Sequence, residues 1–370
     1  GIESLRRAVE ICIQEHVAFV LIAGDLFNTA LPQIEMIKHV AEAFHKLKEK
    51  DIDIYVIPGS HDYSPSGKTM LDVLEKSGLV TNVMKLHNHQ LAFTLDKTGV
   101  KITGMYGRRV GLDTLDYASL DKTNLEQEPG FKIFLFHTTL EEFKPKEFEG
   151  LSGESYMNMP KGFQYYAGGH VHYLFDIRKK DYGLIVYPGP LFPNNFKELE
   201  ELHYGRICIV DDQLHITRVP IKLKDVETFH FDVTDKTPEE VREYIHKEFE
   251  KCDLRGKIVT LRVSGELISG KVSNIPFHEF GKKSGAYVIL KNITQLTSRE
   301  FQQVDVKGSS IEEIEHNVLE EHTRQSAIEN DKELSQRLMV LFNEEKAEGE
   351  TVSDFEKRLV EHVRTLFEKR

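Results

Sequence analysis

The first eighty residues alternate between two patterns of apolar positions. Apolar residues recur every three or four positions in 2–13 and again after Pro32, a spacing that predicts amphipathic helices. Mainly apolar runs at 18–23 and 52–57 predict strands, because runs of this length suit strands that are buried on both faces. With a further helix expected near 68–77, the order is helix–strand–helix–strand–helix, which is typical of a layered α/β domain.

The pattern becomes more β-like from 85 to 106. Further strands are predicted where apolar runs return, at 132–136, 184–192, 204–212 and 213–221. We expect these strands to form a second sheet, and we expect the first domain to close near residue 221.

A second unit is predicted over 225–306. A threonine–proline–glutamate–glutamate stretch forms a capping box with proline at the first helical position, so a helix should span about 238–251. Strands are expected at 257–263 and 286–293. The unit therefore reads as a small α+β domain.

The tail at 310–370 is highly charged and carries two apolar helical stripes. These consist of Leu334, Leu338, Leu341 and Phe342, and of Phe355, Leu359, Val363 and Leu366. A second capping box begins at Ser353 and opens the later helix. We expect a helical hairpin that either covers the core as a lid or docks on another protein, and we favour docking.

Composition narrows the class of protein. The 370 residues are 40% hydrophobic and 29% charged, as in soluble globular proteins. No apolar run approaches the length of a membrane span, and the first residues follow a helix pattern rather than that of a signal peptide. Three scattered cysteines fit a reducing cytoplasm. The net charge of −12 argues against a uniformly basic surface for nucleic acid but leaves room for a local basic groove.

Polar side chains follow four of the predicted strands at the point where each strand ends. They are Asp25; Ser60, His61 and Asp62; His137; and His170 and His172. Taken singly, such an aspartate is more often a helix cap, and such a histidine more often a hydrogen-bonded residue at the edge of the core. Because the ends of strands in one sheet converge, the four together predict a metal site, and histidine with aspartate suits manganese, iron or zinc.

These motifs resemble a known family. The stretches "GDLFN", "GSHD", "FH" and "GHVHY", in this order, are similar to the motifs of calcineurin-like metallophosphoesterases, which have a two-sheet α/β sandwich flanked by helices. Within that superfamily, "LIAGDLFNTALPQ", "YYAGGHVHY" and "VYPGP" resemble the SbcD-type nucleases of DNA double-strand-break repair. The resemblance is strong over 1–220, rests on architecture over 225–306, where it implies a capping and DNA-binding domain, and rests on position alone in the tail.

The resemblance implies two bound ions, for which manganese is the usual choice in this family. Asp25 would bridge the ions, His137 and His170 would bind one, and His172 would bind the other. Two ions a few ångströms apart polarise a phosphodiester and activate a bridging water. The family has asparagine at the position of Ser60. The serine hydroxyl is on a shorter side chain and is a poorer ligand than an amide oxygen, so we expect one ion to bind more weakly.

The resemblance also implies catalytic roles. His61 would stand near the scissile phosphate, as acid to the leaving group or as a stabiliser of the transition state, and Asp62 would orient it. The family's D-x-H motif, which ends its first strand, is absent. We therefore expect that the chain is N-terminally incomplete, that as given it has weakened or no nuclease activity, and that the complete protein is active.

Contacts with DNA are expected from two basic segments. Arg108 and Arg109 lie in one, and Lys144 and Lys146 lie in the other; the alternative is an ordinary solvated surface. The resemblance implies a homodimer and a partner, an SMC-like ABC ATPase of the SbcC type, for which 310–370 is the candidate docking element. The expected location is cytoplasmic and nucleoid-associated, in a prokaryotic-like cell.

Two other functions remain open from the sequence. One is a small-molecule phosphodiesterase, for example of cyclic nucleotides, although such a substrate needs neither a capping domain nor a hairpin. The other is a non-catalytic repair scaffold with a degraded metal site, which Ser60 and the absent D-x-H motif favour and the intact histidines disfavour.

Overall fold

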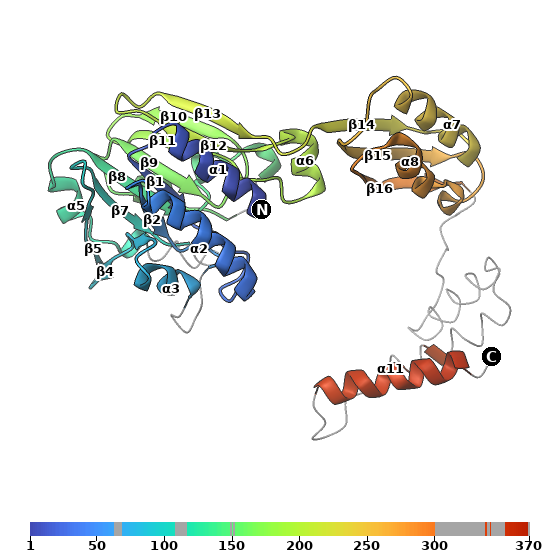
Figure 1. Ribbon diagram of the computed structural model, residues 1–370, viewed down its shortest axis with the longest axis horizontal. Coiled ribbons are helices and arrows are strands. Elements are labelled where there is room, and N and C mark those ends of the chain that lie inside the picture. The colour runs from blue at the N-terminus through green and yellow to red at the C-terminus, as the bar shows by residue number, and fades with distance from the viewer. Residues whose placement is uncertain are drawn as a thin grey trace. The chain divides into compact units, whose positions relative to one another are not determined.

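The computed structural model describes residues 1–62, 69–107, 117–148, 150, 152–299, 337–338, 341 and 352–368 (Figure 1). The chain divides into two compact units. The larger comprises residues 1–233, 241–264 and 276–295, and the smaller comprises residues 234–240, 265–275 and 296–370. The domain limits expected from the sequence, at 1–221, 225–306 and 310–370, stay predictions.

The first sheet consists of three parallel strands in the order β1-β2-β3. Its strands are β1 (Phe19–Ala23), β2 (Asp53–Ile57) and β3 (Thr81–Asn82). The helices α1 (Ile2–Gln14), α2 (Ile34–Lys48) and α3 (Met70–Lys76) alternate with them along the chain. Apolar side chains of the helices, including Val9, Phe44 and Leu71, pack with Ile54 and Val56 of β2. The predicted order of helices and strands is confirmed.

The second sheet has six strands in the order β10-β11-β9-β8-β7-β6. They are β6 (Thr94–Leu95), β7 (Lys101–Met105), β8 (Lys132–His137), β9 (Tyr165–Gly169), β10 (Phe175–Lys179) and β11 (Gly183–Tyr187). The four central strands are parallel, and every residue of β8 is buried, as expected for a strand covered on both faces. Tyr55 and Ile57 of the first sheet pack against Ile133, Leu135 and Tyr165 of the second. The mixed α/β fold with two packed sheets is thereby confirmed.

One expectation about the second sheet is wrong. The runs at 204–212 and 213–221 form a separate two-stranded sheet of β12 (Gly205–Val210) and β13 (Ile216–Ile221). The reason is that the hairpin has apolar residues on both faces, so it fills a gap between other elements. One face packs on Ala8 and Ile11 of α1, and the other packs on the residues between the two main sheets.

The chain before residue 226 also contains shorter elements. They are β4 (Leu86–His87), β5 (Gln90–Leu91), α5 (Thr123–Gln127), α6 (Phe196–Leu202) and the 3₁₀ turns η2 (Glu141–Phe143), η3 (Lys146–Phe148) and η4 (Tyr156–Asn158). The strand predicted over 184–192 ends early, at Tyr187, because the following Pro188 has no amide hydrogen to continue the ladder.

A further sheet has the order β14-β15-β16. Its elements are β14 (Val226–Asp232), α7 (Pro238–Phe249), β15 (Ile258–Leu267), the 3₁₀ turn η5 (Val272–Asn274), α8 (Phe277–Ser284) and β16 (Val288–Ser298). The predicted capping box is present, since Thr237 and Glu240 exchange backbone-to-side-chain hydrogen bonds of 2.8 and 3.3 Å. Figure 1 shows α7 and α8 beside these strands.

Near the C-terminus the structure describes one long helix, α11 (Val352–Glu368), which confirms the helix predicted from Ser353. Two residues of the preceding stripe, Leu334 and Phe342, lie outside the described residues, so the hairpin stays a prediction. Among the described helices, none combines the length and the apolar character that a membrane crossing needs.

Candidate metal centre

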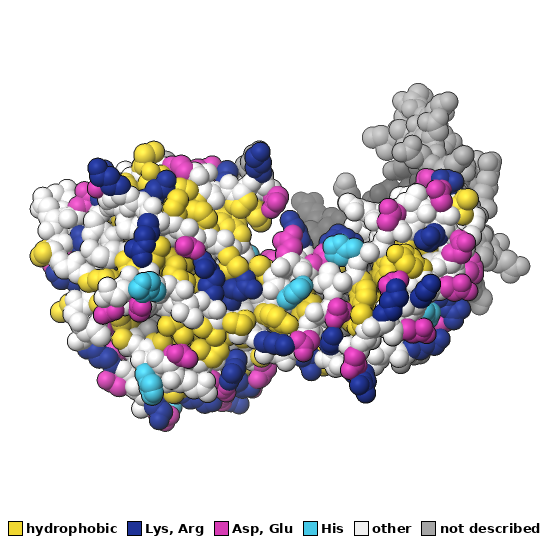
Figure 2. Space-filling model, turned by 90° about the horizontal axis from the view of Figure 1, so that it is seen from above, with side chains coloured by type: hydrophobic (Ala, Val, Ile, Leu, Met, Phe, Trp, Pro, Cys, Tyr) yellow, Lys and Arg dark blue, Asp and Glu magenta, His cyan; other side chains and the backbone are white. Residues whose placement is uncertain are grey.

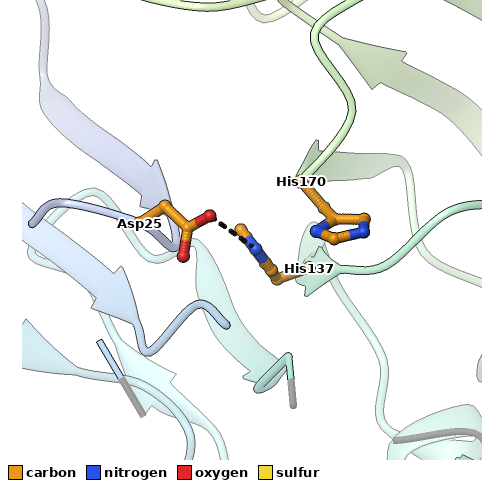
Figure 3. A group of neighbouring side chains, drawn as sticks. All are labelled: Asp25, His137 and His170. Atoms are coloured by element: carbon orange, nitrogen blue, oxygen red, sulfur yellow. Dashed lines mark ion pairs between the residues drawn. The ribbon is translucent and has the colours of Figure 1, made fainter. Parts of the chain in front are cut away.

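The predicted strand ends converge at one edge of the two packed sheets. Asp25 follows β1, His137 ends β8 and His170 follows β9, and β1 packs against both β8 and β9. One ligand atom from each of these three side chains lies within 4.8 Å of the other two (Figure 3). Within the described part of the chain, no other group of three such residues is this close. The three side chains are therefore the candidate metal ligands.

His137 has a buried ring nitrogen with no hydrogen bond. Its side chain is 1% exposed, and its Nδ1 donates a hydrogen bond of 2.7 Å to the carbonyl oxygen of Ala23. That bond leaves the lone pair on Nε2, which lies 3.2 Å from Oδ2 of Asp25 but outside hydrogen-bond geometry. Two acceptors that face each other in a buried place need a proton or a cation between them. The pair therefore fits a metal ion.

The electrostatics show that the pair of Asp25 and His137 favours a positive charge between its two side chains. Burial opposes ionisation of Asp25, but His137 and the backbone amide of His61 outweigh it, and the pKa of Asp25 lies below its ordinary value. Burial also opposes protonation of His137, yet Asp25 raises the pKa of that ring above its ordinary value. Burial, reinforced by His137, lowers the pKa of His170 to about 4. His170 is therefore neutral near pH 7, and a neutral imidazole is the form that binds metal.

Glycines allow the ligands to approach one another. A Cβ atom at Gly169 would lie 1.9 Å from the carbonyl oxygen of Ala23 and 2.9 Å from Nδ1 of His137. A Cβ atom at Gly59 would lie 2.2 Å from Oδ1 of Asp25. Both distances are far below van der Waals contact, so only glycine permits the close approach of these backbones.

Two of the ligands have an unusual backbone conformation. The φ angles of Asp25 and His170 are 53° and 85°, in the left-handed region that side chains other than glycine rarely adopt. Each such residue costs about 1–3 kcal/mol and persists only where its surroundings impose it. The sequence carried no signal for this strain, which turns each side chain away from the direction of its strand.

The GSHD loop contacts Asp25. The backbone amide of His61 donates a hydrogen bond of 2.8 Å to Oδ1 of Asp25, and the hydroxyl of the buried Ser60 lies 3.4 Å from Oδ2. The exposed His61 ring donates through Nδ1 to the carbonyl oxygen of Asn28, at 3.0 Å. The expected neighbours of Asp25 are therefore in place, and Asn28, which sequence reasoning missed, orients the His61 ring.

Asp62 has a different set of partners from the one expected. Its carboxylate is 1% exposed and accepts hydrogen bonds from the backbone amides of Leu26, Phe27 and Gly59, at 3.0–3.1 Å. Burial raises its pKa even though these amides favour the ionised form. These bonds join the loop after β1 to the loop after β2, so Asp62 fixes the loops rather than the His61 ring.

His172 lies outside the three-residue group. Its Nδ1 is 2.7 Å from Oε1 of Glu198, which belongs to α6, and its side chain is partly exposed. Glu198 follows the helix-capping Asn195 by three residues. That spacing is typical of a helix start and gives no signal for the contact with His172.

The predicted DNA contacts are only partly visible. Arg108 and Arg109 lie outside the described residues. Lys144 forms an ion pair of 2.6 Å with Glu141, and Lys146 is exposed at the start of η3. The DNA-binding role of all four residues stays a prediction.

Comparisons with known proteins agree with the motifs. Residues 1–174 match the family model described as calcineurin-like phosphoesterase. The DNA double-strand break repair protein Mre11 of Methanococcus maripaludis is 31% identical over 183 residues, which cover 46% of this chain and 45% of the relative. The uncharacterized metallophosphoesterase YhaO of Bacillus subtilis is 24% identical over 217 residues, which cover 57% of this chain and 50% of the relative.

The solved structures include similar chains as well. The crystal structure of the protein TT1561 of Thermus thermophilus covers 60% of this chain and 93% of its own, with 16% identity and a TM-score of 0.40. The chain spans about half the length of the curated relatives that it matches first.

Proposed function

Because residues 1–174 match the family model described as calcineurin-like phosphoesterase, we propose that the protein is a metal-dependent nuclease that hydrolyses DNA phosphodiester bonds in double-strand-break repair. The observation that carries the proposal is the buried Nε2 of His137, which faces Asp25 beside His170. The similarity to proteins named for double-strand-break repair supports DNA as the substrate.

The proposed cofactor is manganese, with two ions per chain. Asp25, His137 and His170 would hold one ion, with Ser60 beside Asp25, and Asp25 and His172 would contribute to the other. Two bound ions polarise a phosphodiester, lower the pKa of a bound water and stabilise the leaving oxygen. The mixture of imidazole and carboxylate ligands supports a transition metal over calcium.

The other residues have supporting roles in this proposal. The Nδ1–H of His61 donates to the carbonyl of Asn28, so His61 would act as the acid in its doubly protonated form and would give its Nε2 proton to the leaving oxygen. Asp62 keeps the loops of Asp25 and His61 at a constant separation through three backbone amides. A fixed separation matters because proton transfer depends on the distance between donor and acceptor.

DNA contact is proposed for Arg108, Arg109, Lys144 and Lys146. Figure 2 shows Lys and Arg side chains interspersed with Asp and Glu over the visible face, so binding would depend on local groups rather than on a basic coat. The nucleoid is the location that such a substrate implies.

Assembly is proposed on two surfaces. Leu31 and Ile34 near the start of α2, and Val73 of α3, are largely exposed, which supports a homodimer through this region. The apolar stripe of α11, which includes Phe355 and Leu359, supports docking on an SMC-like ABC ATPase.

The test compares two substrates. The complete protein is assayed with Mn²⁺ on plasmid DNA and, side by side, on bis-p-nitrophenyl phosphate, as wild type, Asp25→Asn and the exposed control Asp212→Asn. We expect manganese-dependent DNA cleavage by wild type and by Asp212→Asn, and its loss in Asp25→Asn. Cleavage of the small substrate alone would favour a small-molecule phosphodiesterase, and cleavage of neither would favour a scaffold.

A further inference from the structure

Glu198 contacts His172 through a single carboxylate oxygen. Nδ1 of His172 lies 2.7 Å from Oε1 of Glu198, and an ionised carboxylate is only an acceptor, so Nδ1 must carry the proton. In a neutral imidazole the lone pair then lies on Nε2. The contact therefore selects the tautomer whose Nε2 is available to a metal ion.

The Glu198 carboxylate is itself fixed by its surroundings. Oε2 accepts a hydrogen bond of 2.8 Å from the backbone amide of Asn194, and Oε1 accepts one from the side-chain amide of Asn195. The side chain is only 15% exposed. Because these bonds hold both oxygens, Glu198 presents a constant acceptor to His172.

The helix that carries Glu198 is anchored by a second carboxylate. Glu200 of α6 is 6% exposed and accepts hydrogen bonds from both Nε and Nη2 of Arg262, at 3.2 and 2.5 Å. The Arg262 guanidinium also lies 5.3 Å from the centre of the Phe196 ring. All of these residues belong to the larger unit. The ion pair limits the movement of α6 and hence of Glu198.

We propose that Glu198 is the positioning residue of His172: it fixes the ring with the proton on Nδ1 and leaves the Nε2 lone pair available to a metal ion. Histidine ligands of metals commonly donate their other ring N–H to a carboxylate, which sets the tautomer and raises the basicity of the ligand. This inference rests on the proposed function, because it takes His172 as a ligand of the second ion.

A purely structural role is the competing explanation. Glu198 lies at the third position of α6, where glutamate commonly supports a helix start, and its bonds to Asn194 and Asn195 serve that purpose. A capping residue affects the stability of the helix but has no effect on which nitrogen of His172 is protonated. The tautomer of His172 therefore distinguishes the two roles.

The test is ¹⁵N NMR of the histidine rings in the metal-free complete protein, at a pH well above the ordinary pKa of histidine. The variants are Glu198→Gln, His172→Gln to identify the signal, and Glu201→Gln, which removes the same charge from an exposed position of α6. We expect His172 to be protonated at Nδ1 in wild type and in Glu201→Gln. In Glu198→Gln we expect a mixture of tautomers, because the amide offers a donor as well as an acceptor.

Manganese titration provides the second readout. Binding at the ion that depends on His172 should weaken about 10–100-fold in Glu198→Gln and remain unchanged in Glu201→Gln. A wild-type His172 protonated at Nε2, or a Glu198→Gln spectrum identical to that of wild type, would overturn the inference. If wild type bound no manganese, the proposed function would fail, whereas the NMR result would still decide the role of Glu198.

Discussion

At the scale of single residues, the candidate centre depends on one atom, Nε2 of His137. In the neutral ring, the bond from Nδ1 to the carbonyl of Ala23 leaves this nitrogen with its lone pair, buried and facing the Asp25 carboxylate. A cation satisfies both groups at once, whereas a core histidine normally has hydrogen-bond partners at both nitrogens.

Replacing His137 tests this atom. Loss of a residue that only hydrogen-bonds to a metal ligand weakens metal binding about 10–100-fold. We expect His137→Gln to weaken manganese binding by more than this, because it removes a direct ligand. The measurement is titration of free Mn²⁺ by electron paramagnetic resonance. The control is His45→Ala, since the His45 side chain is 67% exposed on α2. Equal affinity in both variants would refute His137 as a ligand.

Asp96 gives a prediction for stability against pH. Its carboxylate is 2% exposed, and burial opposes ionisation, but hydrogen bonds from Thr98 and Tyr55 outweigh this and lower its pKa. Since the folded pKa is below the unfolded one, its stabilisation is present above the unfolded pKa and is lost as pH falls through the folded pKa. We expect Asp96→Asn to lower the free energy of unfolding by about 1.5–3 kcal/mol at neutral pH.

Urea denaturation across a pH series measures this effect. The difference between wild type and Asp96→Asn should shrink as the solution is acidified, while the exposed control Asp212→Asn should follow wild type throughout. A difference that stays constant down to the acid limit would show that ionisation of Asp96 is not its source.

The residues of the centre were partly predictable from the sequence. Asp25, His137 and His170 were predictable because each follows an apolar run, and strand ends meet at a sheet edge. The contacts of Glu198 and Asn28 were not, because each joins the residue to a histidine that is distant in the chain. Contacts of this kind depend on how loops fold back, which local patterns do not encode.

At the scale of elements, the centre exists because β1 lies very close to β8 and β9. The helices and strands of the first sheet were predictable from the spacing of apolar residues, and so was the capping box of Thr237 and Glu240. The separate β12–β13 hairpin was not predictable, because an apolar run gives no information on which sheet a strand joins.

The approach of β9 to β1 is testable at Gly169. A Cβ atom there would lie 1.9 Å from the backbone oxygen of Ala23, so we expect Gly169→Ala to destabilise the fold by at least about 1–3 kcal/mol. Gly281, in α8, has open space around its Cβ position, and Gly281→Ala should stabilise by about 0.5–1 kcal/mol. Thermal unfolding measures the change in stability of both variants. If both were stabilised or both destabilised, the close approach of β9 to β1 at Gly169 would be contradicted.

The anchoring of α6 is testable at Arg262. Arg262→Met leaves the buried Glu200 with only His230 nearby, so we expect a loss of about 3–5 kcal/mol in the free energy of unfolding. Arg242→Met breaks an exposed ion pair with Glu279 and should cost about 0–1 kcal/mol. Replacing both Glu200 and Arg262 by methionine should restore most of the lost free energy of unfolding. If the double variant stays as unstable as Arg262→Met, the loss comes from packing and not from the unpaired charge.

At the scale of the whole molecule, the fold brings together side chains that are up to 145 residues apart in sequence, from Asp25 to His170. The fold class was predictable because several motifs occurred in the order of the resembling family, and residues 1–174 match that family. The domain limits, the dimer and the ATPase partner were inferred from the resemblance and from the chain's apolar stripes, and they await direct tests.

The most direct measurement is anomalous X-ray diffraction at the manganese absorption edge, from crystals of the protein grown with Mn²⁺. The proposed centre predicts an anomalous peak in contact with Asp25, His137 and His170, and its absence in crystals of His137→Gln. Manganese peaks only at other places, or an unchanged peak in the variant, would contradict the assignment of this centre.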